Sequence, residues 1–311
     1  MILSLIKTRT ATLSLFALSA VLAGAACGSG EDTPAGQDAP VRVVATTYPL
    51  EFFAGRIGGD RVLVENPVPA GGDAHSFKPT PGDLRTISAA DLLVYNGLGF
   101  EPWVDAVLAA GDAPRITVQT ASAEGVLMLD EDGDLVLDPH VWLDPVLAAI
   151  QVRSLLEGLI EADPEGEAVY RANTDILVAE LNALDERFRA RLQSCARDTF
   201  ITAHDAFNYF AARYGLTAVG IAGINPGAEP SPRGLGDLST LVEDEGIRYI
   251  LINPIDSRRL SDTLAKETGA KTLPLHIIQN LTPEQREQGE TYFSLMNVNL
   301  ESVAMTLGCD S

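Results

Sequence analysis

Short apolar runs alternate with amphipathic stretches along most of this chain. Runs of this kind are typical of strands that are buried on both faces of a parallel sheet. In the first half we expect strands at 41–47, 62–64, 92–95 and 116–118, with helices at 50–57, 83–90 and 101–110. In the second half we expect strands at 199–202, 218–221, 249–252 and 272–275, with helices at 206–214, 235–245, 259–268 and 292–307. Strands that alternate with helices in this way predict a parallel sheet in each half.

Between the halves, the pattern changes to that of one long helix. Apolar side chains recur on one helical face at Leu177, Leu181, Leu184, Phe188 and Leu192. A helix of roughly thirty residues is about 45 Å long. The expected fold class is therefore α/β, with two lobes that each hold a parallel sheet flanked by helices, joined by one long backbone helix. We expect the N-terminal lobe at 41–163, the linking helix at 164–195 and the C-terminal lobe at 196–311.

The first residues have the pattern of an export signal. Lys7 and Arg9 precede an uncharged apolar run, Leu13–Ala26, and Cys27 follows it directly. Because a membrane span needs about 20 apolar residues, we interpret 1–27 as a lipoprotein signal peptide with the lipid on Cys27. The alternatives are an uncleaved anchor or a plain secreted protein. The stretch 28–40 has no apolar periodicity and is expected to be a flexible tether.

The composition narrows the classes of function. The chain has 311 residues, of which 43 are acidic and 22 are lysine or arginine, and its net charge is −21. Binding to nucleic acid needs clustered basic residues that neutralise phosphates, so the acidic balance argues against it. Hydrophobic residues make up 46% of the chain, which indicates a folded body rather than a disordered one.

The histidines all lie at the ends of expected strands or in loops that lead into helices. There are 4 of them: His75, His140, His204 and His276. Ligand sites in parallel sheets gather beyond the carboxyl ends of the strands. One histidine in such a place is more often a hydrogen-bonded structural residue, but two from each half predict a metal site in the cleft between the lobes. Imidazole is a ligand for zinc, copper, nickel and iron.

A histidine that binds a metal through one ring nitrogen usually donates the N–H of the other to an acceptor. Three carboxylates close to the histidines in the sequence are candidates for this role: Asp138, Asp144 and Asp205. The sequence does not assign any of them to a particular ring.

Several longer motifs occur in a fixed order. They are Asp73–Pro81, Tyr95–Trp103, Asp138–Pro145, His204–Phe210, Gly223–Pro232 and Ser294–Asn299. With these motifs the chain resembles, over 41–309, the metal-binding lipoproteins of bacterial ABC importers for zinc and manganese. The resemblance implies two lobes joined by a helical backbone, which agrees with the hydrophobic pattern.

The resemblance also implies a ligand set. The first three ligand positions of the family fall on His75, His140 and His204. Zinc-binding members tend to carry histidine at the third position and manganese-binding members a carboxylate, so His204 favours Zn(II). His276 stands at the fourth position, where an acid or water is usual, and it is either a fourth ligand or a residue that misses the metal. Asn253 stands where relatives often carry Glu.

The ligand chemistry agrees with zinc, because manganese prefers oxygen ligands over imidazole. Protons compete with a metal for imidazole, whose unperturbed pKa is about 6.5, so zinc affinity is expected to fall steeply below about pH 6. The acidic stretch 129–134 is expected to be a solvated turn rather than an accessory metal collector.

Two cysteines remain once Cys27 is assigned to lipid. An extracytoplasmic setting permits a disulfide between Cys195 and Cys309, which would pin the C-terminus to the second lobe. The alternative is two buried free thiols.

These observations predict an extracytoplasmic, monomeric protein that is lipid-anchored to the outer face of the cytoplasmic membrane. It would capture Zn(II) in the cleft between the lobes and deliver it to the permease of an ABC importer. The alternatives are a manganese- or iron-binding protein of the same importer class, or a zinc metallohydrolase. Because no His-Glu-x-x-His motif is present, we do not expect an enzyme.

Overall fold

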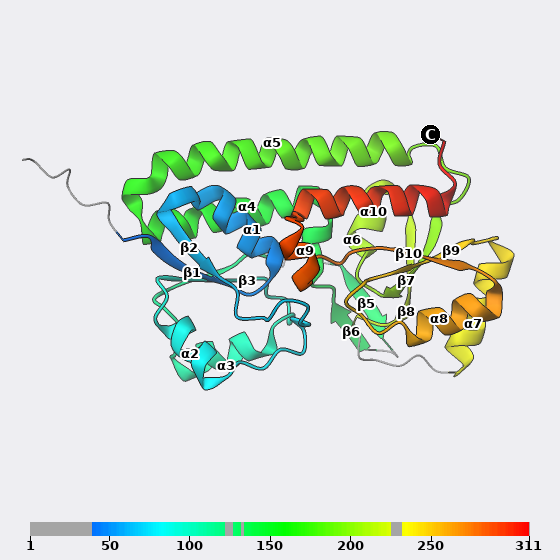
Figure 1. Cartoon of the computed structure of the whole chain (residues 1–311), viewed down its shortest axis with the longest axis horizontal. Helices are drawn as coiled ribbons and strands as arrows, with labels where there is room; N and C mark the ends of the chain where they lie inside the picture. Colours follow the sequence, from blue (N-terminus) through cyan, green and yellow to red (C-terminus); the bar gives the residue numbers. More distant parts are fainter. Residues whose placement is uncertain (1–38, 122–126, 132–133, 225–231, 311) are drawn as a thin grey trace, which may run out of the picture. The chain divides into compact units, whose positions relative to one another are not determined.

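The computed structural model describes residues 39–121, 127–131, 134–224 and 232–310 (Figure 1). Residues Ala39–Ser311 form one compact unit. The signal peptide, Cys27 and most of the tether predicted from the sequence lie outside the described residues, as does most of the motif Gly223–Pro232. Among the described residues, no helix is both long enough and apolar enough to cross a bilayer.

The first sheet has four parallel strands in the order β2-β1-β3-β4. The strands are β1 (Val41–Ala45), β2 (Val62–Glu65), β3 (Leu92–Tyr95) and β4 (Ile116–Gln119). In the register of the sheet, Val43 of β1 is the partner of both Val64 and Leu92. Helices α1 (Tyr48–Gly58), α2 (Pro81–Ser88) and α3 (Pro102–Ala110) flank this sheet, and a 3-10 turn, η1 (Gly59–Arg61), precedes β2.

The second sheet repeats this topology. Its four parallel strands have the order β10-β9-β7-β8, so the first strand in sequence again lies between the second and the third. They are β7 (Thr199–His204), β8 (Thr217–Ala222), β9 (Tyr249–Ile252) and β10 (Lys271–Pro274). The helices of this half are α6 (Asn208–Tyr214), α7 (Pro232–Asp244), α8 (Arg259–Thr268) and α10 (Tyr292–Leu307). The predicted fold class, two parallel sheets with flanking helices and a long helix, is confirmed.

The long helix is shorter than the sequence pattern indicates. Helix α5 runs from Glu167 to Leu192, because Pro164–Gly166 forms a 3-10 turn (η3) and the helix ends three residues before Cys195. A second helix of this layer, α4 (Pro145–Ala162), packs along α5. Asp144 caps α4, since its carboxylate accepts the backbone N–H of Val146 at 2.8 Å.

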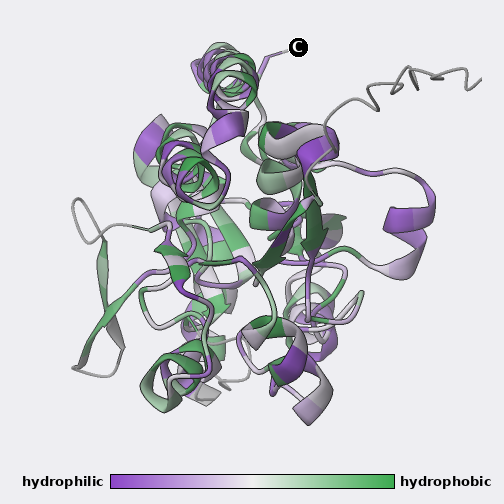
Figure 2. Ribbon diagram, turned by 90° about the vertical axis from the view of Figure 1, so that its left-hand side faces the viewer, coloured by the Kyte–Doolittle hydropathy of each residue, from purple (hydrophilic) through white to green (hydrophobic). Residues whose placement is uncertain are grey.

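A hairpin and a short helix were also not foreseen. Strands β5 (Met128–Glu131) and β6 (Asp134–Leu137) pair as an antiparallel hairpin, where the sequence suggested a solvated turn (Figure 2). Met128, Leu135 and Leu137 are 53%, 65% and 42% exposed, so the apolar side chains on this face of the hairpin lie in solvent rather than in a core. The short helix α9 (Pro283–Glu287) begins with a capping box at Thr282.

One continuous hydrophobic core joins the two halves. Phe53 of α1, Leu181 and Phe188 of α5, and Phe200 of β7 are all fully buried in the same cluster. The predicted disulfide between Cys195 and Cys309 is present and ties the end of α5 to the C-terminal segment. Because both sheets pack into a shared core, the histidines at their edges are held on a single framework.

Candidate metal site

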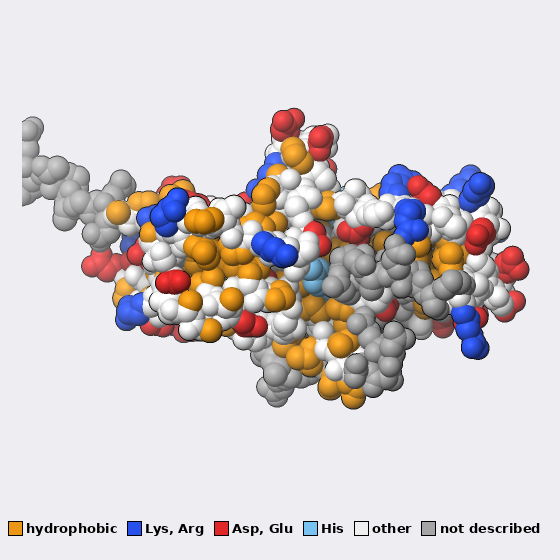
Figure 3. Space-filling view, turned by 90° about the horizontal axis from the view of Figure 1, so that it is seen from below, with side chains coloured by type: hydrophobic (Ala, Val, Ile, Leu, Met, Phe, Trp, Pro, Cys, Tyr) orange, Lys and Arg blue, Asp and Glu red, His pale blue; other side chains and the backbone are white. Residues whose placement is uncertain are grey.

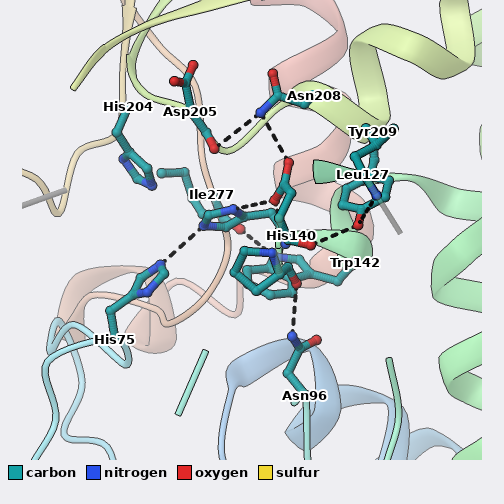
Figure 4. A network of polar contacts seen from close by, with 12 residues as sticks. His75, Asn96, Leu127, His140, Trp142, His204, Asp205, Asn208, Tyr209 and Ile277 are labelled. Atoms are coloured by element: carbon teal, nitrogen blue, oxygen red, sulfur yellow. Dashed lines mark hydrogen bonds and ion pairs between the residues drawn. The ribbon is translucent and has the colours of Figure 1, made fainter. Parts of the chain in front are cut away.

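Three imidazole rings converge at the carboxyl ends of the strands. The ligand nitrogens of His75, His140 and His204 all lie within 4.8 Å of one another. The Nε2 atoms of His75 and His140 are 3.2 Å apart (Figure 4). Two nitrogens that share a tetrahedral zinc at about 2.0–2.1 Å are about 3.3–3.4 Å apart. The observed spacing therefore fits a common zinc ion with little movement.

His75 comes from the loop between β2 and α2. The carboxylate of Asp73 accepts its backbone N–H at 2.9 Å and also accepts the hydroxyl of Ser76 at 3.0 Å. The Phe100 ring packs against the imidazole with 4.1 Å between ring centroids. Figure 3 shows that a histidine side chain, in pale blue, is exposed on one face of the molecule.

His140 lies between β6 and the 3-10 turn η2 (Val141–Leu143) and is fully buried. The Oδ1 atom of Asp138 is 2.9 Å from its Nδ1 and also accepts its backbone N–H. The second carboxylate oxygen of Asp138 accepts the side-chain amide of Asn208 at 3.1 Å. Asp138 thus holds the outer nitrogen of this ring and leaves Nε2 turned toward the other two histidines.

His204 is the last residue of β7 and is 1% exposed. Its Nδ1 lies 3.2 Å from a carboxylate oxygen of Asp256, whereas its Nε2 is buried without a hydrogen-bond partner among the described residues. A buried nitrogen without a partner is costly unless something else, such as a cation, satisfies it. Sequence reasoning missed Asp256, although it follows β9 and so obeys the same strand-end rule as the histidines.

Asn253 supports the carboxylate of Asp256. Its side-chain amide donates to the other oxygen of Asp256 at 2.8 Å. Asn253 therefore helps to hold the Asp256 carboxylate beside His204.

The other sequence-predicted residues lie elsewhere. His276 is not part of the three-histidine group: Asn299 accepts its backbone N–H at 2.6 Å, and its ring Nδ1 lies 3.3 Å from the side-chain nitrogen of Gln285. Asp144 pairs with Arg213 at 2.7 Å besides capping α4. Asp205 accepts the backbone N–H of Gly220 in β8 at 2.8 Å. His276 as a fourth ligand therefore stays a prediction.

Burial favours the neutral form of two of the imidazoles, His75 and His140. Burial, followed by repulsion from His140 and His204, lowers the pKa of His75 to about 2. Burial also lowers the pKa of His140, although the contact with Asp138 opposes this shift. Neutral imidazole is the form that binds a metal, so these rings are prepared for a cation rather than for protons.

The donor set is suited to zinc. Three imidazoles whose ligand nitrogens converge, two of them with a carboxylate on the other ring nitrogen, form a donor set of the kind that holds zinc in proteins. Manganese, which prefers oxygen, is less well served by these donors.

Comparisons with known proteins agree with this geometry. The model of the ZnuA family, described as zinc-uptake complex component A periplasmic, matches residues 43–306. The high-affinity zinc uptake system protein ZnuA of Bacillus subtilis (strain 168) is 34% identical over 309 residues, which cover 94% of this chain and 97% of that protein. The zinc-binding lipoprotein AdcA of Streptococcus pneumoniae is 34% identical over 283 residues, and this match spans 86% of this chain but only 56% of AdcA.

A solved structure shows the same fold with metal bound. The Zn(II)-bound ZnuA-like domain of Streptococcus pneumoniae AdcA superposes with a TM-score of 0.74 at 33% identity, and the match covers 86% of this chain and 99% of that domain. Because the family match extends over most of the chain and relatives above 30% identity cover it, this chain belongs to the ZnuA family of zinc-uptake proteins.

Proposed function

We propose that this chain is the extracytoplasmic component of a zinc importer, which captures Zn(II) on His75, His140 and His204 and delivers it to a membrane permease. The observation that carries the proposal is the convergence of the three imidazoles, with Nε2 atoms of two of them 3.2 Å apart and that of the third buried without a partner. Homologues named for zinc uptake and zinc binding support the same reading.

The way in which the ligands are tied suggests how zinc is released. The loop that leads to His75 is bonded to the segment after β10: Gly71 donates its N–H to the carbonyl of Leu281 at 2.8 Å, and the Asn280 amide donates to the carbonyl of Pro69 at 2.6 Å. The indole of Trp142, two residues from His140, donates to the carbonyl of Ile277 at 2.7 Å. A permease that pulls this segment away would displace two ligand loops together.

The location follows from the first forty residues. We propose that 1–27 is a signal peptide, that Cys27 carries the lipid, and that 28–40 tethers a monomeric body to the outer face of the cytoplasmic membrane. The relative AdcA is named a lipoprotein, which supports this arrangement. Replacing Cys27→Ala should move the protein from the membrane fraction to the soluble fraction, and retention of the variant in the membrane would contradict the lipid site.

A zinc hydrolase is the less favoured function. Catalytic zinc needs a general base beside the open coordination position. The carboxylates that contact the cluster, Asp138 and Asp256, are both held on imidazole nitrogens. Manganese as the cargo is disfavoured because the described three-histidine group offers it imidazole nitrogens and no carboxylate oxygen.

Zinc titration of the histidine variants tests the proposal. His75→Ala, His140→Ala and His204→Ala should each weaken zinc binding by at least about a hundredfold, since each removes one of three ligands. His276→Ala tests the predicted fourth ligand separately: a loss below about threefold would limit the protein ligands to the three-histidine group, and a loss of about a hundredfold would add His276 to them. If the parent protein bound no zinc, or if the first three variants bound it as tightly as the parent, the proposal would fail.

A further inference from the structure

The motif around Tyr95–Trp103 has a backbone conformation that needs an explanation. Gly97, Leu98 and Gly99, which follow β3, have φ angles of 88°, 57° and 78°. Three successive residues in the left-handed region are unusual, and a leucine there costs free energy that its surroundings must offset. A Cβ on Gly97 would lie 2.5 Å from the side chain of Gln119, so the loop is also closely packed.

A buried carboxyl group holds this loop. Glu101 is 3% exposed, and its two oxygens accept the backbone N–H groups of Asn96 at 2.9 Å and Gly97 at 3.0 Å. The hydroxyl of Thr46, the residue after β1, donates to the same carboxyl at 2.5 Å. Glu101 therefore joins the carboxyl ends of β1 and β3, the two central strands of the first sheet. Burial raises its pKa to about 7, against the opposing effect of these hydrogen bonds.

The loop reaches both metal-ligand segments of the first half. The Phe100 ring lies 4.1 Å from the His75 ring and 6.0 Å from the His140 ring, measured between centroids. The Asn96 side chain donates at 2.9 Å to the carbonyl of Pro139, the residue before His140 (Figure 4). The Phe100 ring and the hydrogen bond from the Asn96 side chain thus support the two imidazoles from the same loop.

The loop also meets a cluster that includes Tyr209, a residue of the second half that is hydrogen-bonded beside His140. Leu98 packs against a small buried cluster that contains Val141 and Tyr209. The Tyr209 hydroxyl donates to the backbone carbonyl of Asp138 at 2.8 Å. The loop therefore meets the segment around His140 through the Asn96–Pro139 hydrogen bond and through the cluster that includes Val141.

We propose that Glu101 is a positioning residue for the metal site: by holding the loop 96–100, it sets the separation of His75 and His140. This inference rests on the proposed function, because it assumes that these histidines bind zinc. The ligands of a metal site must be held within about 0.5 Å of their working positions. Hydrogen bonds from the surrounding residues can do this because they fix the position of the loop that contacts the ligands. A carboxyl group accepts from both N–H groups, whereas a glutamine amide would turn its NH₂ toward one of them.

The test compares three variants of the full chain. Glu101→Gln keeps the size of the side chain and removes one acceptor. Asp163→Asn is the matched control: Asp163 accepts from Arg61 and Tyr170 but lies beyond the far end of α4, about 27 Å along the helix from its start at Pro145. Thr46→Val removes one donor to Glu101 without changing its shape, and it decides the matter if Glu101→Gln does not fold.

Two readouts are taken for each variant, namely the zinc dissociation constant by chelator competition and the visible absorption spectrum of the Co(II)-loaded protein. Glu101→Gln should weaken zinc binding about tenfold or more and change the Co(II) spectrum, which reports ligand geometry. Thr46→Val should weaken binding about threefold, and Asp163→Asn should lower thermal stability without altering either readout. Zinc binding by the parent together with unchanged values in both site variants would overturn the role of Glu101 alone, whereas a parent that binds no zinc would overturn the proposed function itself.

Discussion

Lowering the pH from 7.5 to 5 tests whether the fold holds the metal-binding imidazoles neutral. An imidazole with an ordinary pKa of about 6.5 would weaken zinc binding about 30-fold over this range, and three of them would weaken it about 3 × 10⁴-fold. The pKa of His75 is lowered to about 2 and that of His140 is also lowered, so protons at these two rings compete little with zinc above pH 5. We therefore predict a loss of less than about a hundredfold. This replaces the steep loss below pH 6 that unperturbed histidines would give.

The lowered histidine pKa values also make the metal-free protein less stable at acidic pH. Because the pKa of His75 is lower in the folded chain than in the unfolded chain, the unfolded chain takes up the proton first. The histidines should destabilise the metal-free protein progressively as the pH falls below about 6.5. Zinc affinity is therefore measured by chelator competition at each pH, with circular dichroism to show that the protein is folded. A fall in affinity near 10⁴-fold while the protein stays folded would refute the assignment of neutral, preorganised imidazoles.

Three further predictions follow from particular contacts. Asp138→Asn and Asp256→Asn should each weaken zinc binding about 10- to 100-fold in a titration, because they remove the acceptors on the outer nitrogens of two histidines, and unchanged affinity would exclude that role. Asn280→Ala breaks the bonds to the loop before His75, so stopped-flow transfer to a chelator should show faster zinc release by about tenfold, and an unchanged rate would separate this segment from release. Cys309→Ser opens a loop of 114 residues and should lower the free energy of unfolding by about 4 to 5 kcal/mol in a denaturant titration, whereas no change would show that the bridge adds no stability.

The sequence predicts the central strands of the sheets well because β1, β3, β7 and β9 are largely buried and leave clear apolar runs. All eight sheet strands lie within a few residues of their expected positions, including the short β2 and β10. The hairpin β5–β6 left no such signal, since its large apolar side chains Met128, Leu135 and Leu137 face solvent. The start of α5 was misplaced because Pro164 suits both a 3-10 turn and the first turn of an α-helix.

The candidate ligands follow from their places at strand ends, but their partners do not. Asp138 lies two residues before His140 and turns back onto its ring, whereas Asp205 lies next to His204 in sequence and accepts from β8 instead. Asp256 is 52 residues away from His204 along the chain and meets it only because β7 and β9 are neighbours in the sheet. Side-chain direction at a strand end, which decides these pairs, is set by the tertiary fold.

The central claim is that one zinc ion is held jointly by three histidines. Crystals of the zinc-loaded protein, measured at the zinc absorption edge, locate the metal directly by anomalous scattering. The account predicts one strong peak per chain, about 2.0–2.1 Å from the Nε2 atoms of His75, His140 and His204. A peak bound by other residues, or no peak at these rings in protein saturated with zinc, would contradict it.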